Sequence, residues 1–328
     1  MEQKQISIKS DVLLKGTMTF PNSEENQLPA ILFLAGSGNI NRDGSTDKGK
    51  FKFNLYKDLE KIVTQLDFVT LRYDKRGVGE SEGSLLKTGL WDAVSDAEHA
   101  LEFLASHPRV DSNRIIVLGH SEGCIVGTAL NERRPVNGLI LLSGGGGGLQ
   151  ESLDAQRQQV YKEMSNTKGF KGFLIKKLNT IEKSEKQAQG LYRKMTSTSK
   201  DIVKIAGFVK MPAKYFREHF KYDIIEGVKK ITCPVLAING LKDFQTSHDF
   251  LNRIPENAKG PVSLFLIENM DHGLKVQLTP ISALTAKKDY LKTVGKPIHE
   301  ELVKHLTSWL NNWKEDVKNV PQETIHIG

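Results

Sequence analysis

A serine flanked by glycines, in the stretch GHSEG at positions 119–123, is the feature of this sequence best suited to chemistry. It follows the apolar run 115–118 and precedes a second apolar run with helical spacing. A serine in a very tight turn between a buried strand and a helix projects its hydroxyl from the edge of a sheet, provided that the positions two before and two after it lack side chains. The two glycines meet this condition, so the stretch predicts that Ser121 is a nucleophile.

A serine hydroxyl needs a base to accept its proton, and His272 is the favoured candidate among nine histidines. It follows the apolar run 262–268, at the strand end where the sites of α/β proteins assemble. His248 and His299 are expected in or beside helices. His120 lies inside the serine turn and is expected to face away from the hydroxyl.

The base must in turn be oriented by a carboxylate, and Asp243 is favoured for this role. It follows the apolar run 234–240 in the same way that His272 follows its own run. Asp271 is the alternative, although adjacent residues of one loop seldom orient one another. An aspartate in such a turn often only caps a helix, so Asp243 carries weight only together with the serine and the histidine.

Apolar runs and helical periodicity alternate along most of the chain, and they supply the elements that would position these residues. Helical spacing is evident at 56–66, at 90–107 and in the last apolar stripe, which includes Trp309 and Trp313. The alternation predicts an α/β fold with a mostly parallel sheet flanked by helices. The expected strands are a hairpin of 6–10 with 12–20, followed by 30–36, 68–74, 114–119, 138–144, 234–240 and 262–268.

About 90 residues between the expected strands 138–144 and 234–240 lack this alternation of strands and helices. Helical patterns at 153–164, 172–195 and 201–210 predict a helical insertion, because a structureless loop of that length is implausible in a compact domain. The insertion begins with five glycines at 144–148, which form either a hinge or a merely permissive loop. The expected division is a core of 1–144 and 231–328 with an insertion of 145–230.

The formal charge of +7 is concentrated in that insertion. Residues 151–230 contain 18 Lys and Arg against 9 Asp and Glu, a net charge of +9 that leaves −2 for the remaining residues. A surplus of this kind indicates either a solvated helical surface or a region that attracts anionic substrates. No nucleic-acid motif accompanies it, so we expect no nucleic-acid partner.

The cysteines and the hydropathy pattern exclude several other classes of protein. Cys124 and Cys233 lie within or beside apolar runs and lack the spacing of zinc ligands, so we expect no metal, no cofactor and no disulfide framework. The first residues have no apolar run typical of a signal peptide, and no run approaches the roughly 20 residues of a membrane span. The sequence therefore predicts a soluble, cytoplasmic protein.

Four motifs together resemble those of the α/β-hydrolase family, over nearly all of the chain outside the insertion. The similarity is greatest to esterases of the serine-aminopeptidase-like or dienelactone-hydrolase-like group, and the chain order serine, aspartate, histidine is that of the family. The motifs are RYDKRGVGES (72–81), VDSNRIIVLGHSEG (110–123), NGLKD (239–243) and MDHG (270–273).

This resemblance implies an α/β-hydrolase fold and an oxyanion hole formed by the backbone amides of Ser37 and Glu122. Ala35, in LAGSGNINRDG (34–44), stands where the family usually has a histidine. The Glu122 carboxylate stands where many relatives have an uncharged side chain, and it either hydrogen-bonds within the loops or biases the choice of leaving group. The resemblance also implies that the insertion covers the active site as a cap.

The expected function is the hydrolysis of small-molecule carboxylic esters through an acyl-enzyme on Ser121, with His272 as base and Asp243 as its orienting acid. A thioesterase or acyltransferase would use the same three residues, and so would a peptidase of this fold. A peptidase would need acidic residues in the insertion to anchor a substrate amino terminus, whereas the insertion is basic. A non-enzymatic binding protein would be expected to lack one of the three. The oligomeric state is not indicated by the sequence.

Overall fold

A computed structural model describes residues 1–46, 52–279, 281–282 and 284–319. Its main sheet has the strand order β1-β2-β4-β3-β5-β6-β9-β10. The pairs β1–β2 and β2–β4 are antiparallel and the other neighbours are parallel, which confirms the predicted mostly parallel sheet. The strands are β1 (Glu2–Lys9), β2 (Leu13–Phe20), β3 (Leu28–Leu34), β4 (Val69–Tyr73), β5 (Val110–His120), β6 (Gly138–Leu142), β9 (Val235–Gly240) and β10 (Val262–Ile267).

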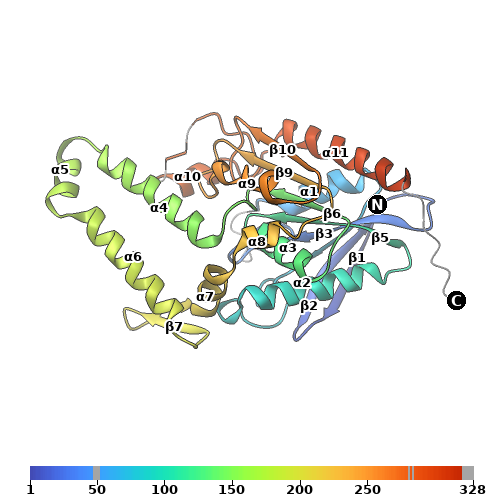
Figure 1. The fold of residues 1–328 in the computed structure, drawn as a ribbon, viewed down its shortest axis with the longest axis horizontal. Helices are drawn as coiled ribbons and strands as arrows, with labels where there is room; N and C mark the ends of the chain where they lie inside the picture. Colours follow the sequence, from blue (N-terminus) through green and yellow to red (C-terminus); the bar gives the residue numbers. More distant parts are fainter. Residues whose placement is uncertain (47–51, 280, 283, 320–328) are drawn as a thin grey trace.

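Helices cover both faces of this sheet (Figure 1). The helices outside residues 149–221 are α1 (Leu55–Thr64), α2 (Leu90–Ala105), α3 (Glu122–Arg133), α8 (Ile224–Val228), α9 (Arg253–Asn257), α10 (Ala286–Leu291) and α11 (Glu300–Asn319), with 3-10 turns η1 (Leu85–Lys87) and η2 (His248–Phe250). None of the helices in the described part of the chain is long and apolar enough to cross a membrane.

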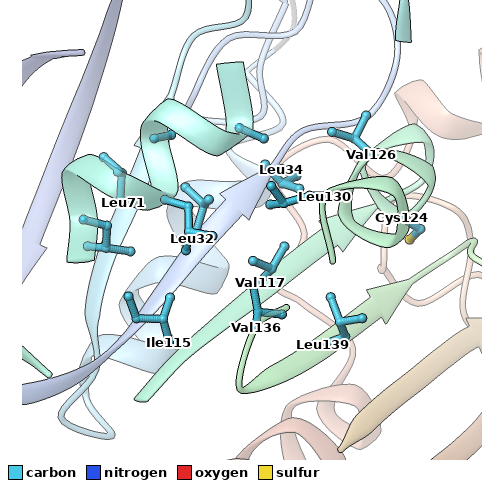
Figure 2. Close-up of a cluster of buried hydrophobic side chains, with 14 of the residues drawn as sticks. Leu32, Leu34, Leu71, Ile115, Val117, Cys124, Val126, Leu130, Val136 and Leu139 are labelled. Atoms are coloured by element: carbon cyan, nitrogen blue, oxygen red, sulfur yellow. The ribbon is translucent and has the colours of Figure 1, made fainter. Parts of the chain in front are cut away.

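Two apolar clusters lie on opposite faces of the sheet because successive side chains of a strand point to opposite sides. On β5, Val117 belongs to the cluster beneath α2 and α3, whereas its neighbour Leu118 belongs to the cluster beneath α1 and α11. Figure 2 shows the first cluster, in which Val126 and Leu130 of α3 lie over the strand residues. The inner parallel strands are therefore buried on both faces, whereas the edge strand β10 is only partly buried, and their carboxyl ends are left to carry polar groups.

The segment between β6 and β9 projects away from the sheet (Figure 1). The helices α4, α5 and α6 form an arm with α5 at its far end, and α7 leads back toward the core. The elements are α4 (Leu149–Ser165), α5 (Gly169–Lys177), α6 (Thr180–Thr196), β7 (Ile202–Ile205), β8 (Val209–Pro212) and α7 (Ala213–Lys221).

The helix predicted at 201–210 is wrong, because these residues form the antiparallel hairpin β7–β8. Three of the four residues of β7 are β-branched, and Ala206 and Gly207 take the positive φ values of 48° and 80° that a tight turn requires. The helical pattern at 172–195 is also divided in two, between α5 and α6, where Asn179 has a φ of 49°. Local turn geometry thus overrides the apolar spacing.

The division at 145–230 stays a prediction. Helix α8 falls inside that range, yet its Ile224 and Val228 pack in the cluster beneath α2 and α3.

The glycine run before α4 includes a tightly packed position, since a β-carbon at Gly146 would lie 2.0 Å from the carbonyl oxygen of Phe250. Gly146 is therefore required by close contact between two segments of backbone.

Candidate active site

Ser121 lies in the turn between β5 and α3, with φ 56° and ψ −120°. A non-glycine residue with a positive φ is strained, and such strain persists only where the surroundings impose it. A β-carbon at Gly119 would lie 2.4 Å from the carbonyl oxygen of Gly123, and one at Gly123 would lie 2.1 Å from that of Leu34. Both glycines are thus required for the turn that presents the Ser121 hydroxyl beyond the sheet edge.

His272 and Asp243 follow β10 and β9, and the structure brings their side chains together. His272 Nδ1 donates to Asp243 Oδ2 at 2.8 Å. Asp243 Oδ1 accepts from the backbone amides of Gln245 and Thr246, at 2.7 and 3.1 Å. The carboxylate is buried, which opposes its ionisation, but attraction to His272 and these hydrogen bonds hold its pKa below the usual value.

Asp271, the alternative acid, is held elsewhere. Its Oδ1 accepts from the backbone amide of Lys275 at 3.0 Å, within its own loop. Burial raises the pKa of the Asp271 carboxyl above its usual value. Within the described part of the chain, Asp243 is the one of the two aspartates that accepts a hydrogen bond from the His272 side chain.

Two pockets meet at Ser121, and both also include Ser37 and Gln245. The first lies against the glycine run and α4, and the second contains His272 together with Tyr56 and Tyr290. Ser121, Ser37 and Glu122 all line the first pocket, so the predicted oxyanion residues lie beside the predicted nucleophile. A substrate centred on Ser121 could place one group in each pocket.

His120, which the sequence places inside the serine turn, takes part in a hydrogen-bonded chain that sequence reasoning missed. Tyr56 Oη accepts from the backbone amide of Gly36 at 2.7 Å and lies 3.1 Å from His120 Nδ1. His120 Nε2 lies 2.9 Å from the carbonyl oxygen of His272. Burial and the nearby His272 lower the pKa of His120 to about 3, so it is neutral, with Nε2 donating and Nδ1 accepting.

This chain joins three loops of the site: the loop of Ser37, the serine turn and the loop of His272. Each hydrogen bond fixes the direction of the next, because neutral imidazole has one donor and one acceptor. Tyr56 comes from α1, far from the other members in sequence, so no local motif indicated it. The other two histidines considered lie elsewhere: His248 is within 3.4 Å of Asp249, and His299 accepts from the amide of Glu301.

A buried ionic cluster lies on the other side of the serine. The Glu122 carboxylate is 3.8 Å from Lys75 Nζ and 3.2 Å from His219 Nε2. Burial opposes its ionisation, yet its contacts with His219, Lys75 and Tyr215 hold its pKa below the usual value. Burial lowers the pKa of Lys75 despite the attraction of Glu122. His219 and Tyr215 belong to α7, so this cluster ties the projecting segment to the first residue of α3.

Lys75 also controls the loop of Ser37, because its ammonium donates to the carbonyl oxygen of Gly36. Asp74 also holds this loop in place, because its Oδ1 accepts a hydrogen bond from the backbone amide of Arg42 at 2.7 Å. Both residues belong to the RYDKRG stretch that the sequence singled out without a role. Their pairing with residues 36, 42 and 122 is long-range, and the spacing of the motif alone could not reveal it.

The described residues contain no group of three or more His, Cys, Asp or Glu side chains arranged to hold a metal ion. Cys124 and Cys233 are both unpaired and buried. Ser121 in its strained turn, His272 and the buried Asp243 carboxylate lie at one edge of the sheet. The hydrogen bond to Asp243 selects the tautomer of His272. This arrangement can support acyl transfer through the serine hydroxyl.

Comparison with known proteins shows which family the sequence is similar to. The sequence model of the family described as serine aminopeptidase, S33, matches residues 52–276. Esterase EstD of Thermotoga maritima is 26% identical over 246 residues, which cover 75% of this chain and 53% of EstD. The chain thus spans about half the length of that relative.

Two solved structures are similar in fold. Est1E from Butyrivibrio proteoclasticus, with ferulic acid bound, has a TM-score of 0.58 at 16% identity, covering 88% of this chain and 98% of Est1E. Esterase Pf2001 of Pyrococcus furiosus has a TM-score of 0.56 at 15% identity, covering 95% of this chain and 91% of that one. Both likenesses concern the arrangement of the backbone.

Proposed function

The chain belongs to the serine aminopeptidase (S33) family of α/β hydrolases, and we propose that it hydrolyses carboxylic esters of small molecules at Ser121. The observation that carries this proposal is the 2.8 Å hydrogen bond from His272 Nδ1 to buried Asp243, beside the pocket that Ser121 and His272 share. A carboxylate on Nδ1 selects the tautomer whose Nε2 has a free lone pair for the serine proton. The name of the relative EstD, an esterase, supports the same reaction class.

The reaction would proceed in two halves. Ser121 Oγ bonds to the acyl carbon while His272 Nε2 takes the hydroxyl proton, and the imidazolium is stabilised by Asp243. The proton then passes to the leaving alcohol as the ester C–O bond breaks, which leaves Ser121 acylated. Water attacks the acyl carbon, His272 takes its proton, and the carboxylic acid departs as Ser121 Oγ regains a proton.

The amides of Ser37 and Glu122 would stabilise the oxyanion. Glu122 is the first residue of α3, where backbone N–H groups lack partners within the helix. In a trans peptide the carbonyl and the next N–H point in opposite directions. Lys75 holds the Gly36 carbonyl, so the Ser37 N–H is directed away from Lys75. Lys75 would thereby perform a positioning role for which the family usually has a histidine at the position of Ala35.

We further propose that the inserted segment acts as a cap over the pockets. His219 of α7 contacts Glu122 beside the nucleophile, and Gln156 of α4 lines a pocket with Ser121. Gln156 also donates to the carbonyl oxygen of Gln245 at 2.7 Å. These contacts would make the segment a wall of the acyl or alcohol subsite.

An aminopeptidase would need a free carboxylate near the serine to bind the substrate ammonium. The Glu122 carboxylate is adjacent, but it already contacts Lys75 Nζ at 3.8 Å and His219 Nε2 at 3.2 Å. The surplus of basic residues at 151–230 also disfavours a cationic substrate end. Ester hydrolysis is therefore the better supported reaction, with thioester hydrolysis and acyl transfer using the same residues.

A panel of p-nitrophenyl esters of increasing acyl length, run beside aminoacyl-arylamides and acyl-CoA, tests this proposal. We expect kcat/KM for at least one ester to exceed that for every arylamide and every acyl-CoA by about tenfold or more. Preferential cleavage of an aminoacyl-arylamide would identify a peptidase instead. Preferential cleavage of acyl-CoA would identify a thioesterase.

A further inference from the structure

Helix α5, at the far end of the projecting arm, exposes large apolar side chains to solvent (Figure 1). Phe170 is 74% exposed, Phe173 is 57% exposed, and Leu178 at the end of the helix is 53% exposed. Phe170 and Phe173 are three residues apart, so they lie on one side of the helix. Folding leaves this apolar surface in water, which is a cost unless something covers it.

The opposite side of α5 faces the protein. Gly172 is buried, and a β-carbon there would lie 1.9 Å from the carbonyl oxygen of Thr167. Ile175 lines a groove together with Tyr161 of α4 and Ile181 of α6. The orientation of α5 is therefore fixed by packing on its inner side, and the phenylalanines are held outward.

Basic residues surround the exposed phenylalanines. The stretch 164–181 contains no aspartate or glutamate, and its four lysines are all exposed: Lys168, Lys171, Lys176 and Lys177. Lys177 Nζ lies 5.7 Å from the centre of the Phe173 ring, so the charge and the aromatic surface belong to one patch. We call residues 168–178 the α5 tip.

The charge of the α5 tip decides between possible partners. In a two-fold contact between copies of this chain the same patch would face itself, which would set lysines against lysines. A partner protein would need a concave acidic pocket for two phenylalanines, whereas a lipid surface adapts to a projecting end. Exposed aromatic side chains ringed by lysines match the border between anionic headgroups and acyl chains.

We propose that the α5 tip binds the surface of membranes that contain anionic lipids. Phe170 and Phe173 enter the interface between headgroups and acyl chains, while the lysines remain at the level of the lipid phosphates. The arm would thereby hold the protein at a lipid surface without any membrane-spanning segment. This inference is independent of the proposed ester hydrolysis, since it requires binding alone.

Sedimentation of the full-length protein with sucrose-loaded vesicles tests the proposal. We expect binding to vesicles of phosphatidylcholine that contain about 30% phosphatidylglycerol. Binding to vesicles of pure phosphatidylcholine should be at least about tenfold weaker. Raising the salt concentration should weaken binding, because the lysine contribution is screened. Failure to bind anionic vesicles at low salt would overturn the proposal.

Substitutions within the α5 tip, with one control outside it, localise the surface. Phe170→Ser with Phe173→Ser should weaken vesicle binding by about tenfold or more, and each of Lys168→Gln and Lys171→Gln by about fivefold. Phe208→Ser is the matched control, since Phe208 is 79% exposed at the turn of the β7–β8 hairpin. It should bind vesicles like the unmodified protein. Loss of binding only in Phe208→Ser would place the surface on the hairpin and contradict the proposal.

A second copy of the chain, as the alternative partner of the α5 tip, would give a different experimental result. If the α5 tip joined two copies of the chain, light scattering after size-exclusion chromatography would show a dimer that the double serine variant converts to a monomer. That result, without vesicle binding, would overturn the membrane proposal. Circular dichroism of each variant confirms that the fold is intact, because both phenylalanines are exposed and their loss should not affect folding.

Discussion

The two sides of Ser121 are held by different kinds of interaction. On the side of His272, neutral groups donate and accept in sequence through Tyr56 and His120, and the buried Asp243 carboxylate accepts from the His272 side chain. On the side of Glu122, charges are buried together and tie the turn to Lys75 and to α7. A chain of neutral hydrogen bonds fixes the orientation of the side chains that form it. A buried ionic cluster holds together the chain segments that carry its charges.

This difference predicts that changes on the His272 side reduce the rate of the chemical step. Changes on the Glu122 side should affect the oxyanion loop and the stability of the fold.

Asp243→Asn should have the largest effect after loss of the nucleophile. An amide at this position no longer selects the His272 tautomer or stabilises its imidazolium, so kcat should fall about 10³- to 10⁴-fold on the best p-nitrophenyl ester. Asp271→Asn is the matched control, because Asp271 lies beside His272 in sequence but bonds to the Lys275 amide. It should change kcat by less than about tenfold. The reverse ranking would assign the acid role to Asp271.

Lys75→Met should lower kcat by about 10- to 100-fold with little change in KM. The variant keeps an apolar stem but frees the Gly36 carbonyl, so the Ser37 amide loses its fixed direction in the transition state. Steady-state kinetics separate kcat from KM. Lys61→Met, an exposed lysine on α1, should leave both constants unchanged. A Lys75→Met enzyme with normal kcat would show that the loop is oriented without the lysine.

Glu122→Gln should act mainly on stability, because the backbone amide at 122 is retained. The buried Lys75 loses its carboxylate, and we expect the free energy of unfolding at pH 7 to fall by about 3 kcal/mol in urea denaturation. The pKa of Glu122 is lower in the folded protein than its usual value, so its contribution is present above pH of about 4.3. The difference between the two proteins should therefore shrink as the pH falls below that value. A difference that stays constant would show that ionisation of Glu122 is not involved.

Tyr56→Phe should have the smallest effect on the reaction. It removes one donor to His120 and one acceptor for the Gly36 amide, and a single hydrogen bond of this kind corresponds to about a 2- to 10-fold change in kcat. Tyr222→Phe is a matched control, since Tyr222 donates to Glu132 away from the serine. A Tyr56→Phe enzyme indistinguishable from the control would mean that the chain through His120 does not position the site.

The positions of the candidate site residues could be predicted from the sequence, because these residues follow the ends of strands. Ser121, Asp243 and His272 each come directly after an apolar run, and parallel strands bring their carboxyl ends to one edge. Asp243 was preferred to Asp271 by this positional rule, and the structure places Asp243 on His272 Nδ1. The inner parallel strands of the sheet were also predicted, because burial on both faces leaves a clear apolar run.

Other features could not be derived from local patterns. The hairpin β7–β8 was interpreted as helix because its apolar residues also fit helical spacing, and the turn at Gly207 decides between the two. The contacts of Lys75 with Gly36 and Glu122 join residues from three strand ends, so they depend on the completed sheet. The contact of Glu122 with His219 depends further on the path of α7, which no spacing indicates.

The most direct test of the account is the covalent labelling of the nucleophile. A fluorophosphonate probe should react with the protein, and mass spectrometry should find the phosphonyl group on Ser121. Ser121→Ala should abolish both labelling and ester hydrolysis, while its circular dichroism spectrum stays that of the unmodified protein. Labelling that persists in the Ser121→Ala protein, or that is found on another residue, would contradict the assignment of Ser121 as the nucleophile.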